Sequence, residues 1–199
     1  MQRSKDLFCQ VIVTIKIYTM KRLKLPIGII VLYCLLCFAQ CKKSNPDSNG
    51  LPAATQDGKN TLGFLLNGQP WKPQGSNGTA NLSIDFDAGF NNGVCGISAY
   101  RIISSNNREY FKLGIIDSLN FYTAPFTIPL TNSGLALFYF SDNNCLLIST
   151  ESGTNVTGNL SVSKLDRINR IIAGTFSATL SKTGCPEIKI TDGRFDMKF

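Results

Sequence analysis

Residues 61–199 contain no long segment in which apolar residues follow the 3.6-residue spacing of a helix. Short apolar or alternating stretches recur instead, separated by clusters of Asn, Gly, Ser and Asp. Period-two alternation between turn residues is typical of antiparallel strands. These 139 residues are enough for one domain with its own core. The sequence therefore predicts a single all-β domain over 61–199, an antiparallel β-sandwich built from consecutive hairpins, with a β-barrel as the alternative.

The strongest turn signal lies near the C-terminus. Asp192-Gly193 favours a two-residue type I′ turn, because that turn needs positive φ at both central positions. A turn there would pair Ile190 with Phe195 on one face and would place charged pairs of opposite sign on the other. The sequence therefore predicts a C-terminal hairpin.

Turn residues elsewhere divide the domain into further strands. A three-residue loop at 167–169 would close a hairpin with Asp166 opposite Arg170. The stretches 135–140 and 145–150 are almost wholly apolar, so we expect two central strands covered on both faces. The other strands are expected at 61–67, 81–87, 93–104, 108–117, 156–166 and 170–180.

Residues 20–41 have the order of a secretory signal. A short basic stretch starts at Met20, an apolar run of 15 residues follows at 25–39, and Cys41 comes soon after. The run is shorter than the ~20 residues of a membrane-spanning helix, so a removed signal is favoured over a retained anchor. Met20 is a better start than Met1. We therefore expect a signal region over 1–40 and a flexible tether, rich in Ser, Asn, Pro and Gly, over 41–60.

Two cleavage positions compete in this leader. Residues 38–41, Phe-Ala-Gln-Cys, resemble the lipobox of bacterial lipoproteins, in which Cys41 would become the lipidated N-terminus. Gln40 departs from that pattern, and ordinary cleavage after Ala39 is the alternative. Lipidation at Cys41 is favoured, because a polar tether beginning with two lysines follows it at once. The expected location is the cell envelope, with the protein anchored at the outer membrane. The sequence does not decide between the periplasmic face and the cell surface.

The net charge of +7 belongs mainly to the leader. Residues 41–199 hold 14 Lys and Arg against 12 Asp and Glu, a balance of +2. Such a surface has no electrostatic footprint for nucleic acid, so we expect no nucleic-acid partner.

An odd number of cysteines follows Cys41. In an oxidising compartment, Cys95, Cys145 and Cys185 favour one disulfide and one remaining thiol, and the sequence does not choose the pair. Three separately buried thiols are the alternative.

The absence of histidine restricts the chemistry. It excludes Ser-His-Asp and Cys-His nucleophiles and removes the commonest catalytic metal ligand. Because no phosphate loop or zinc spacing occurs either, we expect no cofactor and no metal site. Asp85 and Asp87 would share one face of a strand, either as a calcium or acid–base pair or, as we favour, on a solvated surface. The other acidic candidates lie at predicted strand ends and turns: Glu109, Asp117, Asp142 and Glu151.

Four aromatic residues form the candidate ligand surface. Trp71 could stack on a sugar or a peptide, although a place capping the core is favoured. Phe121, Tyr122 and Phe126 lie in an irregular, proline-bearing stretch. They form either a binding surface or, as we favour, a cover over an open end of the sheets.

Two motifs bracket the predicted domain. The opening one is NTLGFLLNGQPWKP at 60–73, and the closing one is GTFSATL at 174–180 followed by IKITDGRFDMKF at 188–199. They resemble the motifs of an uncharacterised lipoprotein domain family of Bacteroidota. The resemblance implies a small β-rich domain on a lipid anchor, and it implies no activity. Members often carry a cysteine where this chain has Phe64, which implies that a disulfide partner is lost here.

Three functional hypotheses follow. The leading one is a lipid-anchored, non-catalytic binding module of the cell envelope, with a carbohydrate or a peptide as ligand. The second is an envelope hydrolase that uses two carboxylates, either Asp85 with Asp87 or Glu109 with Asp117. The third is a structural subunit that pairs an edge strand, 194–199, with a neighbour. The oligomeric state stays open.

Overall fold

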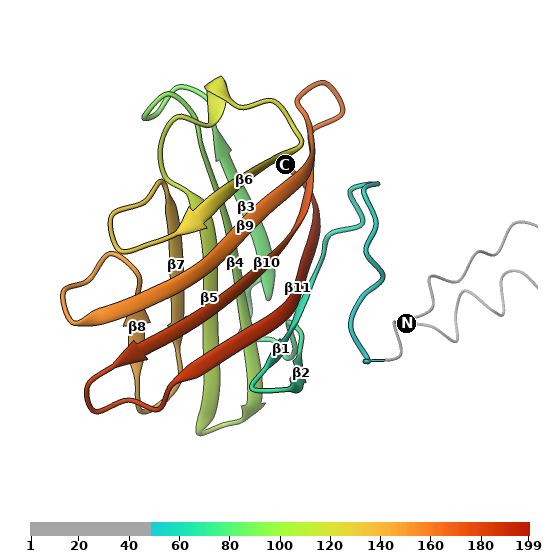
Figure 1. The fold of residues 1–199 in the computed structure, drawn as a ribbon. Helices are drawn as coiled ribbons and strands as arrows, with labels where there is room; N and C mark the ends of the chain where they lie inside the picture. The colour runs from blue at the N-terminus through green and yellow to red at the C-terminus, as the bar shows by residue number, and fades with distance from the viewer. Residues whose placement is uncertain (1–48) are drawn as a thin grey trace, which may run out of the picture. The chain divides into compact units, whose positions relative to one another are not determined.

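The computed structural model describes residues 49–199, which form two antiparallel sheets facing each other (Figure 1). The larger sheet has the order β2-β1-β11-β10-β9-β6, and the smaller one has the order β3-β4-β5-β7-β8. This arrangement confirms the predicted all-β sandwich, and neither sheet closes into a barrel. The elements are β1 (Thr61–Leu66), β2 (Gln69–Trp71), β3 (Leu82–Asp87), β4 (Val94–Ser104), β5 (Asn107–Ile115), the 3-10 helix η2 (Leu119–Phe121), β6 (Phe126–Leu130), β7 (Ala136–Ser141), β8 (Leu146–Ile148), β9 (Thr154–Asp166), β10 (Ile171–Lys182) and β11 (Ile188–Lys198).

An aromatic cluster fills the space between the sheets. Phe64 of β1 stacks on Trp71 with ring centroids 4.6 Å apart, and it meets Phe111 of the other sheet at 4.9 Å. Phe111 in turn packs against Phe138 and Phe176. Aromatic pairs at such distances stabilise a core beyond the area they bury. The cluster therefore joins the two sheets at the centre of the domain.

The predicted C-terminal hairpin is wrong. β11 runs unbroken through Asp192 and Gly193, with β1 on one side and β10 on the other. The register shifts against both neighbours at this point, which marks a β-bulge. Asp192 adopts a φ of 53°, so the preference that suggested a turn is satisfied by the bulge. The extra residue also brings Ile190 and Phe195 onto the same buried face.

The remaining hairpins follow the prediction with changes in register. Ile171, rather than Arg170, lies opposite Asp166, and the loop is one residue longer because Arg170 takes the left-handed conformation. The two apolar strands do pair as β7 and β8, but β8 is an edge strand rather than a central one. Since β11 lies inside its sheet, residues 194–199 are not an edge strand, so the candidate strand named for the third hypothesis is wrong.

A disulfide joins loops that belong to different sheets. Cys145 lies between β7 and β8, and Cys185 lies between β10 and β11; the two are bonded. Cys95 is the free cysteine of residues 49–199, and it is buried. The structure therefore gives one disulfide and one thiol and chooses the pair that the sequence left open.

Residues 51–59, which we call the strap, differ from the flexible tether expected there. Leu51 is fully buried, and the strap lies along β1 and β11. Asp196 of β11, with no exposed surface, accepts hydrogen bonds from the Thr55 hydroxyl at 2.5 Å and the Gly58 amide at 2.7 Å. Two further strap amides donate to it, those of Asp57 and Lys59. The folded unit therefore begins about ten residues before β1.

The signal region, Cys41 and the start of the expected tether lie outside the described residues. Over residues 49–199, no helix has the length and apolar character needed to cross a membrane.

Candidate functional site

The smaller sheet carries a groove on its outer face, away from the core. Its register places four residues in one row across β3, β4, β5 and β7: Asp85, Gly96, Gly114 and Leu137. Residues of neighbouring rows and of the loop after β3 surround a space of about 580 Å³. Two glycines side by side therefore form the floor of an outer-face groove.

The two floor glycines have different reasons to be glycine. A Cβ on Gly114 would lie 3.0 Å from the carbonyl oxygen of Cys95, so close backbone approach favours glycine there. A Cβ on Gly96 would meet nothing within 4 Å, and its φ is not in the left-handed region. Glycine weakens a strand interior, so packing gives no reason for Gly96. The result is an open floor that most other side chains would fill.

The rim of the groove combines polar and apolar groups. The exposed carboxylates of Asp85 and Asp87 lie along one side, and Ser98 and Lys112 lie in the next row. The Phe90 side chain, 58% exposed, stands at the end of the groove together with Ile116. Aromatic and aliphatic groups beside a few hydrogen-bonding groups are typical of small-molecule sites.

Hydrogen bonds hold the loop that carries Phe90. The Gly93 amide donates to the Phe90 carbonyl at 2.8 Å, and the Asn91 side chain donates to the carbonyl of Ile116. From the other side, the Asn120 side-chain amide donates to Ala88 at 2.8 Å. The aromatic end of the groove is therefore positioned by η2 and by the end of β5.

The predicted ligand surface divides in two, and the part at Trp71 is wrong. The Trp71 side chain is fully buried, and one face of its ring lies on Phe64. Its indole Nε1 donates to Glu109 at 2.6 Å, and the Arg101 guanidinium lies 5.6 Å from the ring centroid. No face is left for a ligand, so Trp71 caps the core, the alternative that the sequence favoured.

The aromatic stretch after β5 is partly exposed. Phe121 is 76% exposed, whereas Tyr122 and Phe126 are half-buried, pack against the core and contact each other at 4.5 Å. Leu119, just before them, is fully buried. Figure 1 shows η2 at the same end of the domain as the loop after β3. Since its neighbour Asn120 is hydrogen-bonded to Ala88 in the loop after β3, Phe121 lies near the groove, but it is not among the residues that line it.

The structure separates Glu109 and Asp117, which rules out one carboxylate pair. They lie eight residues apart along β5 and its extension, roughly 25 Å in an extended chain. Glu109 also forms an ion pair with Arg101 at 2.7 Å. Asp142 accepts two amides of its own turn, and Glu151 pairs with Lys182 at 3.3 Å. With Glu109 and Asp117 separated, Asp85 and Asp87 are the remaining predicted pair, and Asp87 also accepts the Gly89 amide at 2.7 Å.

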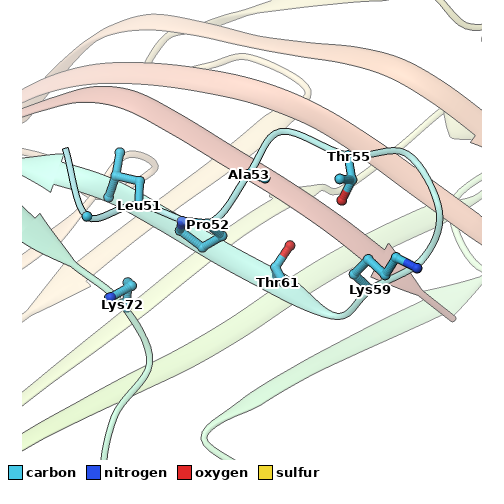
Figure 2. A pocket seen from close by; sticks show the side chains of 8 residues that line it. Leu51, Pro52, Ala53, Thr55, Lys59, Thr61 and Lys72 are labelled. Carbon is cyan, nitrogen blue, oxygen red and sulfur yellow. The ribbon is translucent and has the colours of Figure 1, made fainter. Parts of the chain in front are cut away.

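A second, smaller pocket of about 230 Å³ lies under the strap. Figure 2 shows Lys59 and Lys72 at opposite ends of it, with Thr61 between them and Pro52 and Leu51 above β1. The two ammonium groups do not converge on one point. This pocket therefore does not form an anion site.

The groove floor covers the free cysteine. Cys95 points from β4 into the core, and burial, together with the nearby charge of Asp85, raises the pKa of its thiol to about 12. Since the thiolate is the reactive form, this thiol is not a nucleophile at neutral pH. No group of three or more Cys, Asp or Glu side chains within residues 49–199 is placed to hold a metal ion.

Sequence reasoning missed most of the groove. It found Asp85 and Asp87 but not Phe90, Ile116 or the paired glycines. The signal for the glycines was the register of the β4–β5 hairpin, in which Gly96 lies opposite Gly114. A turn centred on residues 106 and 107 would not place these two glycines opposite each other. The observed turn lies one residue earlier, and a bulge at Ile103 shifts the pairing by one further residue.

Comparison of the chain with family models, curated proteins and solved structures gives no match.

Proposed function

We propose that the protein is a lipid-anchored, non-catalytic binding module of the cell envelope, and that its outer-face groove binds a carbohydrate. The observation that carries the proposal is the open floor at Gly96, a glycine that the fold does not require. A sugar presents a flat C–H face and a ring of hydroxyl groups. Phe90 offers an aromatic surface for the first, and Asp85, Ser98 and Lys112 offer hydrogen-bonding groups for the second.

The test is a glycan array screen of the full chain, followed by titration calorimetry with the glycans that bind. Gly96→Val would fill the floor, and Phe90→Ala would remove the aromatic surface; each is expected to weaken binding at least tenfold. Phe121→Ala is the matched control, because Phe121 is an even more exposed phenylalanine, at 76% against 58% for Phe90, and does not line the groove. Loss of binding in Phe121→Ala alone would move the site to the aromatic stretch. Absence of any glycan ligand would reject the carbohydrate.

The proposed location rests on the sequence of the leader. Lipidation at Cys41 predicts that cells supplied with an alkyne-tagged fatty acid incorporate the tag into the protein and that Cys41→Ser abolishes incorporation. Fractionation would then place the tagged protein in the outer membrane, and protease treatment of whole cells would identify its face. Equal labelling of the Cys41→Ser variant would contradict the lipid anchor.

A carboxylate-dependent hydrolase is the second candidate, and the favouring observation is that Asp85 and Asp87 face the same groove. Side chains two residues apart on one strand face lie roughly 7 Å apart, which suits an acid–base pair. Incubation of a bound glycan with the protein distinguishes the candidates. Cleavage products that disappear in Asp85→Asn would establish the hydrolase, whereas an intact glycan supports the binding module.

A further inference from the structure

β3 is the least protected edge strand of residues 49–199. The two sheets end in four edge strands, β2, β6, β3 and β8. β2 and β8 have three residues each, and β6 contains Pro129. Short length, proline and charged side chains are among the ways in which a sheet edge avoids pairing with another chain. β3 has six residues and no proline, so its edge is protected only by the charges of Asp85 and Asp87, which a basic partner would neutralise.

The hydrogen-bonding groups on this edge follow from the ladder with β4. The amide of Tyr100 donates to the carbonyl of Asn81 at 3.0 Å. Because bonding alternates along an antiparallel strand, Ser83, Asp85 and Asp87 bond toward β4. The N–H and C=O groups of the alternate residues, Leu82, Ile84 and Phe86, therefore point away from the sheet. No other segment of residues 49–199 pairs with these groups.

The side chains of β3 specify what could lie beside it. On the inner face, Leu82, Ile84 and Phe86 pack against the core but stay half-exposed. On the outer face, Asp85 and Asp87 are exposed. A strand added here would place alternate residues over the half-exposed apolar side chains and the others beside two carboxylates. Apolar residues suit the first set, and Lys or Arg suit the second.

We propose that β3 binds an extended segment of another protein in which apolar residues alternate with Lys or Arg, so that the segment becomes a sixth strand of the smaller sheet. A second copy of β3 fits poorly, because two copies would bring four aspartates onto one face. The proposal goes beyond carbohydrate binding, since it uses the backbone edge of β3 rather than the floor of the groove.

The test uses the full chain in a mild non-ionic detergent and a fluorescent ten-residue peptide of alternating Val and Lys. Fluorescence anisotropy should show saturable binding, and an alternating Val and Glu peptide should bind at least tenfold more weakly. N-methylation separates edge pairing from charge attraction, because an added strand bonds to β3 through only every second amide. Methylation of one alternate set should abolish binding, and methylation of the other should preserve it. Equal effects of the two sets would overturn the proposal.

Ile84→Pro tests the same edge from the protein side. The Ile84 amide points away from β4, so proline removes it without breaking the β3–β4 ladder. Peptide binding should be lost in Ile84→Pro and kept in Ile84→Val, while the groove variants Gly96→Val and Phe90→Ala should keep it. Peptide binding to a folded Ile84→Pro protein would overturn the proposal, whereas failure of glycan binding would bear only on the groove. If Ile84→Pro does not fold, the methylated peptides decide the question.

Discussion

Two glycines, Gly193 and Gly96, have different roles in this fold. Gly193 lies at the bulge of β11, where a Cβ would come within 2.5 Å of the Phe176 carbonyl oxygen and 2.6 Å of its ring. Gly96 faces open space instead. One glycine is demanded by the backbone of a neighbouring strand, and the other leaves a surface bare. The sequence alone gives both the same letter.

Alanine at these two positions should therefore have opposite effects on stability. Gly193→Ala should lower the free energy of unfolding by about 2–3 kcal/mol, because the strand must move away from Phe176. Gly96→Ala should raise it by about 0.5 kcal/mol, because glycine in a strand costs conformational entropy. Urea unfolding followed by tryptophan fluorescence measures both. A Gly193→Ala protein with the stability of wild type would contradict this prediction and would show that the bulge can relax.

Trp71 shows how far a single residue could be predicted. Its place in the core follows from its size and its lack of charge, and the sequence favoured that place. Its partner did not follow, because Glu109 lies 38 positions away and reaches the indole only when β1, β2 and β5 are assembled. Trp71 and Glu109 belong to different sheets, so their contact depends on how the two sheets pack together, which local sequence patterns do not determine.

At the scale of elements, alternation predicted the strands better than the turns. Most strands lie where apolar periodicity placed them, because a half-buried strand shows its buried face in every second residue. The bulge in β11 was missed because Asp-Gly satisfies a turn and a bulge equally well. Neighbours decide between them: β11 has a strand on both sides and gains hydrogen bonds by continuing. The strap was missed because its hydrogen bonds join residues far apart in the sequence, Thr55 and Asp196 being 141 positions apart, and because one buried leucine makes no apolar pattern.

The strap and β11 give a prediction that depends on Asp196. Burial alone would raise the pKa of this carboxyl, but hydrogen bonds from Thr55, Gly58, Asp57 and Lys59 outweigh burial and hold the pKa below its usual value of 3.8. Asp196→Asn should lower the free energy of unfolding at pH 7 by about 2 kcal/mol, because the amide cannot accept all four bonds. Asp192→Asn, at an exposed position of the same strand, is the control and should change stability by less than ~0.5 kcal/mol.

The pH dependence of the Asp196→Asn effect has a definite sign. A lowered pKa in the folded state adds stability above the unfolded-state pKa, and that stability disappears as the pH falls through the folded-state pKa. The difference between wild type and Asp196→Asn should therefore be constant from pH 7 to about 5 and shrink below pH 4. Urea unfolding at several pH values measures it. A difference that grows toward acid would show that the charge of Asp196 is unfavourable in the folded protein.

For the whole molecule, the disulfide acts on the relation between the two sheets. Cys145 and Cys185 are 40 positions apart, and each lies in a loop of a different sheet. Replacing both by alanine should lower the free energy of unfolding by about 4 kcal/mol, as the closure of a loop of this length predicts. Guanidinium unfolding of the two forms measures the loss. Native Cys95 should resist alkylation in both, since it is buried; rapid alkylation of Cys95 would contradict the sandwich core.

If Cys41 carries a lipid, the strap also limits the distance between the folded domain and the membrane. A tether of 19 residues, from position 41 to 60, would span about 65 Å when fully extended. Since the folded unit begins near Leu51, only about ten residues remain, with a reach of about 35 Å. The volume that the domain can reach around Cys41 is then roughly a sixth of the volume that the 19-residue tether would allow, because volume scales with the cube of reach. A lipid-anchored protein with so short a tether would bind ligands only in the layer directly next to the membrane, and a longer tether would let it bind ligands farther away.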